Sequence, residues 1–164
     1  RVPRPAGAPS AATAAAPWLP RAPAGTAAAG GALAAPLTAE AHARELQRLI
    51  AMERLFSDSA AAIGIGPAFE ALGADDAWHL GGPQDREFNK GNRVIARAVQ
   101  GDAPAGSSPV TWSAERAILA PSGDLGVTLG YIVPNAAQPD GSRRGFPFFT
   151  IWRREPAGWK YIAE

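Results

Sequence analysis

Apolar residues dominate three strand-like runs in the last third of the chain, residues 110–119, 125–133 and 145–154, and a short run at 159–164 follows. Alternation with a period of two is typical of strands that bury one face. The linkers between these runs are rich in Pro, Gly, Asn, Asp and Ser, which favour turns between antiparallel strands. The pattern therefore predicts an antiparallel meander.

Upstream of the meander the apolar residues follow a helical period. A long helix is predicted from Thr38, as N-cap, to Gly64, as stop. Its apolar face carries Leu46, Leu49, Ile50, Phe56, Ser57 and Ala60. A short helix is predicted over 67–72, a strand over 77–80 and a third helix over 88–100. This order predicts an α+β domain in which helices pack on one face of a curved antiparallel sheet.

The first 36 residues have a different composition, with seven prolines, long alanine runs, three arginines and no acidic residue. Such a segment buries too little apolar surface to offset the entropy of ordering it. We therefore expect a low-complexity flexible leader over 1–36 and a folded domain over 38–164. Residues 22–43 also resemble a weak export signal, and the alternative is a spacer, so both a periplasmic or secreted and a cytoplasmic location stay open.

The folded part is nearly neutral, because 3 of the 16 basic residues lie in the leader and the remaining 13 face 15 acidic ones, a net charge of 13 − 15 = −2. Without a basic stripe, a nucleic-acid partner is not expected. The absence of cysteine excludes disulfides and thiolate chemistry, and two histidines predict no metal cluster. We find no cofactor motif and no apolar run of membrane-spanning length, so neither a cofactor nor a membrane is expected.

Within residues 43–164, six short motifs follow one another: Ala51-Met-Glu-Arg-Leu-Phe56, Ala68-Phe-Glu-Ala-Leu-Gly-Ala-Asp-Asp-Ala77, Thr111-Trp-Ser113, Ser122-Gly-Asp-Leu-Gly-Val-Thr-Leu-Gly130, Thr150-Ile-Trp-Arg-Arg154 and Gly158-Trp-Lys160. In this order and spacing the chain resembles the SnoaL-like, ketosteroid-isomerase-like superfamily, whose cone-shaped α+β fold also occurs in nuclear transport factor 2. It looks closest to a bacterial branch of unknown function. The resemblance implies a conical pocket between the first helix and the concave sheet, and homodimers formed through the sheet.

The catalytic residues of ketosteroid isomerases do not carry over to this chain. Where those enzymes have an aspartate base the chain has Gly81, and where they have a hydrogen-bonding tyrosine it has Ser57. The resemblance therefore does not imply ordinary steroid isomerase chemistry.

Glu53 is a catalytic candidate, since it falls in the middle of the apolar helix face beside Leu49 and Ile50. A carboxylate there is costly to bury as an anion, so it must be protonated, paired or facing a water-filled pocket. A raised pKa would suit general acid or base work. The structural alternative is that Glu53 accepts hydrogen bonds from Arg153 or Trp112 and holds the helix to the sheet.

His79 and Tyr131 are two further catalytic candidates. His79 lies on a predicted strand and is either a pocket acid or base or a hydrogen-bonded structural group. The Tyr131 hydroxyl would orient a ligand, or else Tyr131 is a core residue. Asp75 and Asp76 precede the strand, where aspartates are ordinary turn residues.

The aromatic residues predicted to wall an apolar pocket, or alternatively to fill the core, are Phe56, Trp78, Trp112, Phe148 and Trp152. The arginine pairs 143/144 and 153/154 are expected to be solvated near strand ends. In the strand from 145, Phe149 and Ile151 point away from Phe148 and Trp152, so both faces of the sheet are apolar. A homodimer through the sheet would cover the outer face.

The sequence predicts a protein with a pocket for a small hydrophobic molecule. One hypothesis adds cofactor-independent isomerase, dehydratase or hydrolase-like chemistry. The other is a non-catalytic binding or dimerisation module whose cone is filled by its own side chains.

Overall fold

The computed structural model describes residues 35–81, 87–137, 141 and 145–164. Over these residues the elements follow in the order α1 (Ala39–Ile63), α2 (Ile65–Leu72), β1 (Gly73–His79), β2 (Asn89–Lys90), α3 (Asn92–Gln100), β3 (Val110–Leu119), β4 (Leu125–Pro134), β5 (Phe146–Glu155) and β6 (Gly158–Ala163). The predicted leader lies outside the described residues apart from its last two positions.

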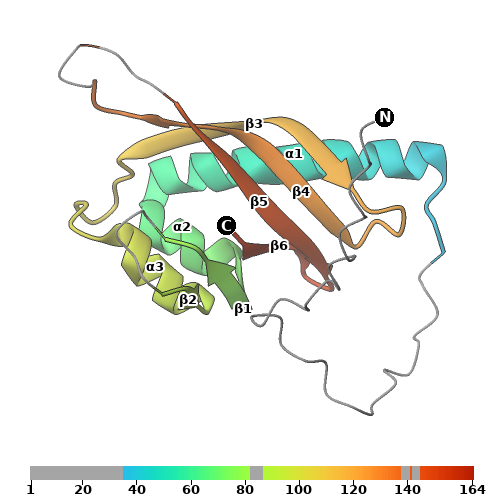
Figure 1. Ribbon diagram of the computed structural model, residues 1–164, viewed down its shortest axis with the longest axis horizontal. Coiled ribbons are helices and arrows are strands. Elements are labelled where there is room, and N and C mark those ends of the chain that lie inside the picture. Colours follow the sequence, from blue (N-terminus) through green and yellow to red (C-terminus); the bar gives the residue numbers. More distant parts are fainter. Residues whose placement is uncertain (1–34, 82–86, 138–140, 142–144) are drawn as a thin grey trace, which may run out of the picture. The chain divides into compact units, whose positions relative to one another are not determined.

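The strands form one curved sheet in the order β2-β1-β6-β5-β4-β3 (Figure 1). The predicted meander is present, because β3 pairs with β4, β4 with β5 and β5 with β6, each time antiparallel. The expectation of an antiparallel sheet is wrong at one place, because β1 pairs with β6 in parallel. All the elements from β2 to β5 lie between these two strands in the sequence, so no hairpin turn dictates their relative direction. The fold class is α+β, with helices packed against an open sheet.

Two predicted boundaries shift. β1 begins at Gly73, four residues before the predicted start at 77, because Asp75 and Asp76 belong to the strand and are exposed on it. α3 begins at Asn92 and not at 88, since Gly91 adopts a φ of 89° and interrupts the helical backbone. Asn89 and Lys90 instead form β2, which pairs with the end of β1.

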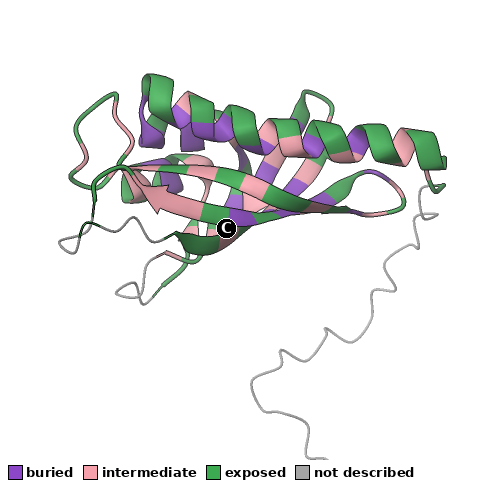
Figure 2. Cartoon of the chain, turned by 90° about the horizontal axis from the view of Figure 1, so that it is seen from above, coloured by how far each residue is buried: buried purple, intermediate pink, exposed green. Residues whose placement is uncertain are grey.

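α1 has nearly the predicted bounds. The Thr38 side chain accepts a hydrogen bond from the Ala41 backbone N–H, and Gly64, with a φ of 99°, ends the helix. The helix lies along one face of the sheet and turns its buried residues toward it (Figures 1 and 2). Those buried residues are Glu45, Leu49, Glu53, Phe56, Ser57 and Ala60. Leu46 and Ile50, also predicted on this face, are only half-buried.

The core is an aromatic cluster centred on Phe56. Its ring centroid is 4.7 Å from that of Phe69 on α2, 5.0 Å from Trp112 on β3, 6.1 Å from Trp152 on β5 and 5.5 Å from Tyr161 on β6. Aromatic pairs at these separations add to the free energy gained from burying their surface. The cluster therefore joins α1 and α2 to the strands and holds the helices against the concave face.

The other face of the sheet is apolar and, within the part of the chain that the structure describes, no helix covers it (Figure 2). Its exposed large apolar residues are Ile118, Leu125, Leu129, Tyr131 and Phe149. The strand register places Leu129 opposite Phe149 and Val127 opposite Ile151, so the apolar side chains form continuous rows.

None of the described helices is both long enough and apolar enough to cross a bilayer.

Candidate functional site

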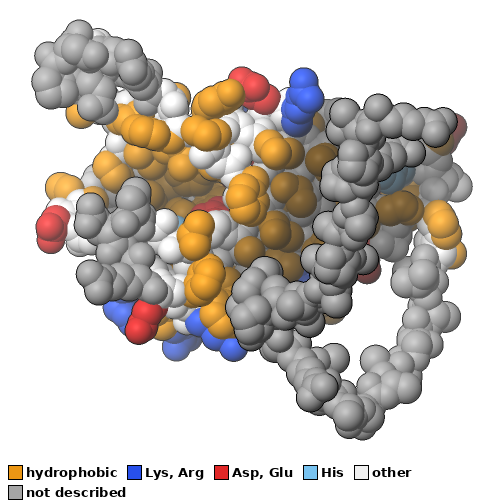
Figure 3. Space-filling model, viewed as in Figure 1, with side chains coloured by type: hydrophobic (Ala, Val, Ile, Leu, Met, Phe, Trp, Pro, Cys, Tyr) orange, Lys and Arg blue, Asp and Glu red, His pale blue; other side chains and the backbone are white. Residues whose placement is uncertain are grey.

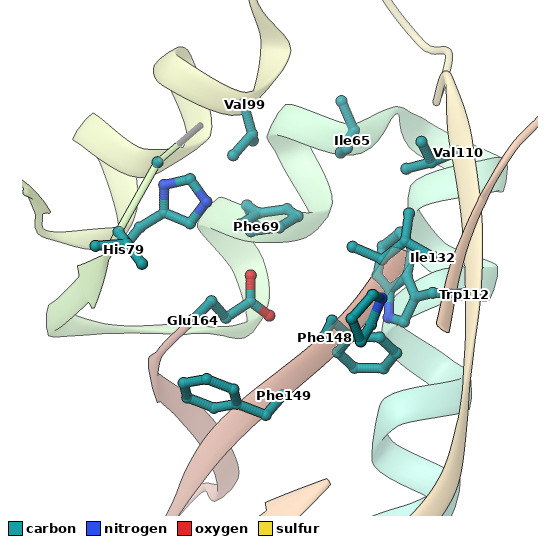
Figure 4. Close-up of a pocket in the computed structure, with 13 residues that line it drawn as sticks. Ile65, Phe69, His79, Val99, Val110, Trp112, Ile132, Phe148, Phe149 and Glu164 are labelled. Atoms are coloured by element: carbon teal, nitrogen blue, oxygen red, sulfur yellow. The ribbon is translucent and has the colours of Figure 1, made fainter. Parts of the chain in front are cut away.

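A pocket of about 340 Å³ opens where α2 and α3 face the first half of β5 (Figure 4). Its apolar walls include Ile65, Phe69, Val99, Val110, Ile132 and Phe148. Figure 3 shows hydrophobic side chains around a hollow on the side of the domain seen in Figure 1. This volume is at the lower end of the ~300 to 1,000 Å³ that small-molecule sites occupy. The pocket also means that side chains do not fill the cone completely.

The polar groups in the pocket wall come from neighbouring strands. β5 pairs with β6 only over 151–155, and the pocket opens beside the rest of β5. Glu164 directly follows β6, and His79 ends β1. Because β1 and β6 are parallel neighbours, with Trp78 opposite Ala163, His79 and Glu164 are brought to the same end of the sheet and both line the pocket (Figure 4).

Glu164 is the carboxyl group of the pocket, and the sequence analysis missed it. Its backbone N–H donates to the Trp78 carbonyl at 3.1 Å, and its carbonyl accepts from the Leu80 N–H at 2.8 Å. Its side chain is hydrogen-bonded to the Thr150 hydroxyl, with an Oγ1–Oε1 distance of 3.1 Å. Burial raises the pKa of Glu164 well above its ordinary value, the nearby Glu53 charge raises it further, and the Thr150 hydrogen bond lowers it. Glu164 thus favours the neutral acid form.

A β-bulge in β6 directs Glu164 toward the pocket. Trp152 pairs with Tyr161, yet the preceding residue Ile151 pairs with Ala163, so Ile162 is an extra residue in β6. Strict alternation from the buried Tyr161 would point Glu164 to the outer face. The extra residue reverses the alternation, and Glu164 meets Thr150 on the concave side.

His79 packs against the pocket wall. Its ring lies edge-on to Phe69, with centroids 6.2 Å apart and an interplanar angle of 84°. Gly81, which stands where ketosteroid isomerases have their base, also lines the pocket. Imidazole and carboxyl groups at one pocket can donate and accept protons near neutral pH.

Glu53 is fully buried behind the pocket wall and does not line the pocket. Trp112 Nε1 donates to its Oε1 at 2.6 Å, Trp152 Nε1 donates to its Oε2 at 3.2 Å, and the Thr128 hydroxyl donates to the same Oε2. Burial raises the pKa of Glu53, and hydrogen bonds from Thr128, Trp112, Thr150 and Trp152 oppose that rise. The carboxyl group therefore ties α1 to β3, β4 and β5.

Of the two partners predicted for Glu53, Trp112 forms a hydrogen bond with it, whereas Arg153 contacts other carboxylates. Arg153 makes a two-pronged ion pair with Asp76, with its shortest contact at 2.7 Å, and also contacts Glu155 at 2.7 Å. The pKa of Asp76 is lowered, chiefly by the hydrogen bond from Arg153. Arg154 reaches the buried Glu45 at 3.6 Å. The second arginine pair, 143/144, lies outside the described residues.

The remaining predicted site residues lie in three places. Trp112 and Phe148 line the pocket, while Phe56 and Trp152 are fully buried in the core and do not line it. Trp78 is 45% exposed, with the Lys90 ammonium 4.8 Å from its ring centroid and Phe88 against its edge. Tyr131, 47% exposed, belongs to the outer face.

Ser57, which stands where ketosteroid isomerases have their tyrosine, is buried, and its hydroxyl accepts the Trp112 backbone N–H at 3.0 Å. In the described part of the chain, no three acidic or histidine side chains gather in a way that could hold a metal ion.

The domain is similar to several solved structures. An NTF2-like protein of unknown function from Pseudomonas putida KT2440 aligns with a TM-score of 0.55 at 17% identity, over 74% of this chain and 84% of that one. A candidate ketosteroid isomerase from Parabacteroides distasonis aligns with a TM-score of 0.53 at 15% identity, over 72% and 83%. The association domain of CaMKII from C. elegans aligns with a TM-score of 0.54 at 9% identity, over 76% and 95%.

At these identities the similarity shows the fold alone. The domain thus has the NTF2-like fold, as the order of its motifs predicted. The chain matches no protein-family model and no curated protein.

Proposed function

We propose that this protein binds a compact, largely apolar small molecule in the pocket beside β5 and transfers a proton to or from it without a cofactor. Glu164 and His79 are the proposed acid and base groups. Isomerisation, dehydration and hydrolysis are the reaction types that such a pair serves.

The observation that carries this proposal is a carboxyl group with a raised pKa held among apolar walls. Burial raises the pKa of Glu164, so its carboxyl group keeps a proton to higher pH than an exposed glutamate does and can act as a general acid. No lysine or arginine is among the described residues that line the pocket, so no cation there would balance an anionic ligand. The expected ligand is therefore uncharged and apolar, with one polar group directed at Glu164.

The other predicted site residues take supporting roles in this proposal. Trp112 and Phe148 form the wall that a ligand would contact. Glu53 holds Trp112 in place from behind, and Phe56 and Trp152 support that wall from the core.

A variant that fills the pocket tests the proposal. Val99 lines the pocket from α3, so Val99→Trp should remove the space that a ligand needs. The matched control is Val94→Trp, on the same helix at a position that is 40% exposed and outside this pocket. Native mass spectrometry and thermal-shift assays would use a panel of uncharged ring compounds and their carboxylate counterparts.

We expect uncharged compounds to bind the wild type and the Val94→Trp variant, and not the Val99→Trp variant. Glu164→Gln should retain binding and lose any turnover of a bound compound. Equal binding by Val99→Trp, or a preference for the carboxylates, would contradict the assignment of this pocket.

The exposed outer face supports a second proposal, association into a homodimer. Ile118 is 63% exposed, and the Val127–Ile151 and Leu129–Phe149 pairs continue the same apolar surface. A two-fold dimer would bury this surface against its own copy. Phe149 belongs both to this surface and to the lining of the pocket, so a dimer would reach one edge of the pocket.

Ile151→Lys would put a charge into the proposed interface. Light scattering at high micromolar concentration should show a dimer for the wild type and a monomer for this variant. Ala51→Lys, on an exposed position of α1, is the control and should remain dimeric. A monomeric wild type would rule out the dimer while leaving the pocket proposal untouched.

A further inference from the structure

The pocket follows the backbone edge of β5 instead of lying over one face of the sheet. Three consecutive residues of this strand line it, Pro147, Phe148 and Phe149. Successive side chains of a strand point to opposite faces, so a pocket on one face could not touch all three. The pocket therefore meets the edge of the strand, where backbone N–H and C=O groups point.

The opposite wall is built in the same way, from the consecutive residues His79, Leu80 and Gly81. In the sheet, β6 lies between β1 and β5, and it pairs with β5 only as far as Ile151. Within the described residues no strand continues the line of β6 beyond this point. A position one strand wide is thus left between 147–149 and 79–81, with Glu164 at its end, and we call it the strand gap.

Hydrogen bonds show to which side each backbone group of β5 points. The Arg154 N–H donates to the Asp124 carbonyl at 2.8 Å, on the side of β4. The register between β4 and β5 has no shift along its length. In an antiparallel pair, every second residue directs both its N–H and its C=O to the partner strand. Even-numbered residues of β5 therefore face β4, and odd-numbered residues face the strand gap or β6.

Phe149 accordingly directs its N–H and its C=O into the strand gap. Pro147 directs its carbonyl there and has no N–H, which fits the usual place of proline at sheet edges. In the part of the chain that the structure describes, no strand pairs with these two residues on this side. An unpaired strand edge is a template for a further strand.

We infer that the strand gap binds a short extended peptide with uncharged, apolar side chains, which pairs with Phe149 and runs antiparallel to β5. In strand addition of this kind, main-chain hydrogen bonds give affinity and pockets for alternate side chains give specificity. This inference deepens the proposed function, because it names a ligand class for the same pocket, and it does not depend on proton transfer.

The width of the strand gap favours a single chain over a second copy of the domain. Two strands on either side of a third are about 9.5 Å apart, twice the spacing of neighbouring strands. A second copy would bring a whole sheet edge, which the wall at Leu80 and Gly81 obstructs. The open edge covers residues 146–150, about 17 Å of extended chain.

The pleat of the sheet decides which side chains of the peptide are buried. Residues opposite each other on neighbouring strands point to the same face. Peptide residues opposite Phe148 and Thr150 would point toward the concave side and the apolar walls of the pocket, such as Val99. The residue opposite Phe149 would point outward. Every second side chain must therefore be apolar, because an unpaired charge is costly to bury there.

Hydrogen exchange of the backbone amides, measured by NMR on the whole chain without ligand, tests the open edge first. The Phe149 amide should exchange roughly a hundredfold or more faster than those of Phe148 and Thr150, which face β4. Protection of the Phe149 amide in the free chain would overturn the inference, because another segment would then occupy the edge. Protection that grows with protein concentration would assign the edge to a second copy and would overturn it equally.

Peptide binding tests the occupant. The probe is an acetylated, amidated pentapeptide of alternating threonine and leucine, with leucine at the two positions that face the pocket. It should shift the Phe149 amide signal and slow its exchange. Methylating the threonine nitrogens removes the donors that face β5 and should weaken binding about tenfold. Replacing the leucines with lysines should abolish binding.

Two variants of one residue separate the backbone from the side chain. Phe149→Pro removes the N–H that faces the strand gap and leaves the β4 ladder intact, whereas Phe149→Ala keeps that N–H. Phe149→Pro should bind the peptide about tenfold more weakly than Phe149→Ala. Should Phe149→Pro fail to fold, the methylated peptide on the wild type gives the same test.

Equal affinity of the methylated and unmethylated peptides, or no binding of either, would overturn the inference. The proposed function can fail separately, since its own test uses ring compounds and the Val99→Trp variant. Binding of ring compounds without binding of the peptide would remove the peptide alone, and binding of neither would remove both.

Discussion

Replacing Glu53 tests what holds α1 to the sheet. Glu53 is fully buried and accepts hydrogen bonds from Trp112, Thr128 and Trp152, which lie on three different strands. Glu53→Ala would leave the Trp112 N–H and the Thr128 hydroxyl without their acceptor, whereas the Trp152 N–H keeps the Thr128 oxygen at 2.9 Å. An unsatisfied buried donor costs roughly 1 to 3 kcal/mol.

The expected loss in the free energy of unfolding follows from these contacts. At about 1 to 2 kcal/mol for each of these two donors, Glu53→Ala should cost about 2 to 4 kcal/mol. Removing a buried charge returns part of its desolvation penalty, which favours the lower half of this range. The total stability of a domain is only about 5 to 15 kcal/mol, so the loss should be obvious in any unfolding assay.

Glu53→Gln should cost less. Its amide oxygen can take the Oε2 position and still accept from Thr128 and Trp152, whereas its amide NH₂ would face the Trp112 N–H. One mismatched donor predicts a loss of about 1 to 3 kcal/mol. Asp58→Ala is the control on the same helix, since Asp58 is exposed and only weakly paired with Arg54 at 3.7 Å.

Urea unfolding followed by tryptophan fluorescence measures these differences, because Trp112 and Trp152 lie in the network itself. The expected order of destabilisation is Glu53→Ala, then Glu53→Gln, with Asp58→Ala within about 0.5 kcal/mol of the wild type. A loss below about 1 kcal/mol for Glu53→Ala would refute the reasoning, because the Trp112 and Thr128 donors would then have found water or other acceptors.

Two further predictions follow from the structure. Glu164 has a raised pKa in the folded protein, so between its unfolded-state and folded-state pKa values the folded state binds more protons than the unfolded state. The free energy of unfolding should therefore fall as pH rises above about 4.3, the ordinary pKa of a glutamate. Thermal unfolding measured across pH should show this decrease, and Glu164→Gln should make it smaller. Gly130→Ala should cost about 1 to 3 kcal/mol in chemical unfolding, because its Cβ would lie 1.9 Å from the Ser113 backbone oxygen. Gly126→Ala should cost less, since its nearest neighbour is the Leu49 side chain, which can move; equal losses would contradict this view.

The sequence determined the elements whose signals are local. Thr38 and Gly64 marked the ends of α1 because caps act on the neighbouring turn, and alternation marked the meander because each strand buries one face. It also singled out Glu53 and its partner Trp112, since a carboxylate on an apolar helix face needs a donor. The NTF2-like fold was predictable at this level.

The site depended on contacts between residues that are distant in the sequence. The parallel pairing of β1 with β6 brings His79 beside Glu164, and no local pattern specifies that pairing. The bulge at Ile162 turns Glu164 into the pocket, against the simple alternation of its strand. Tertiary structure alone decided which carboxyl group lines the pocket, because a one-residue change in strand register moves a side chain from one face of a sheet to the other.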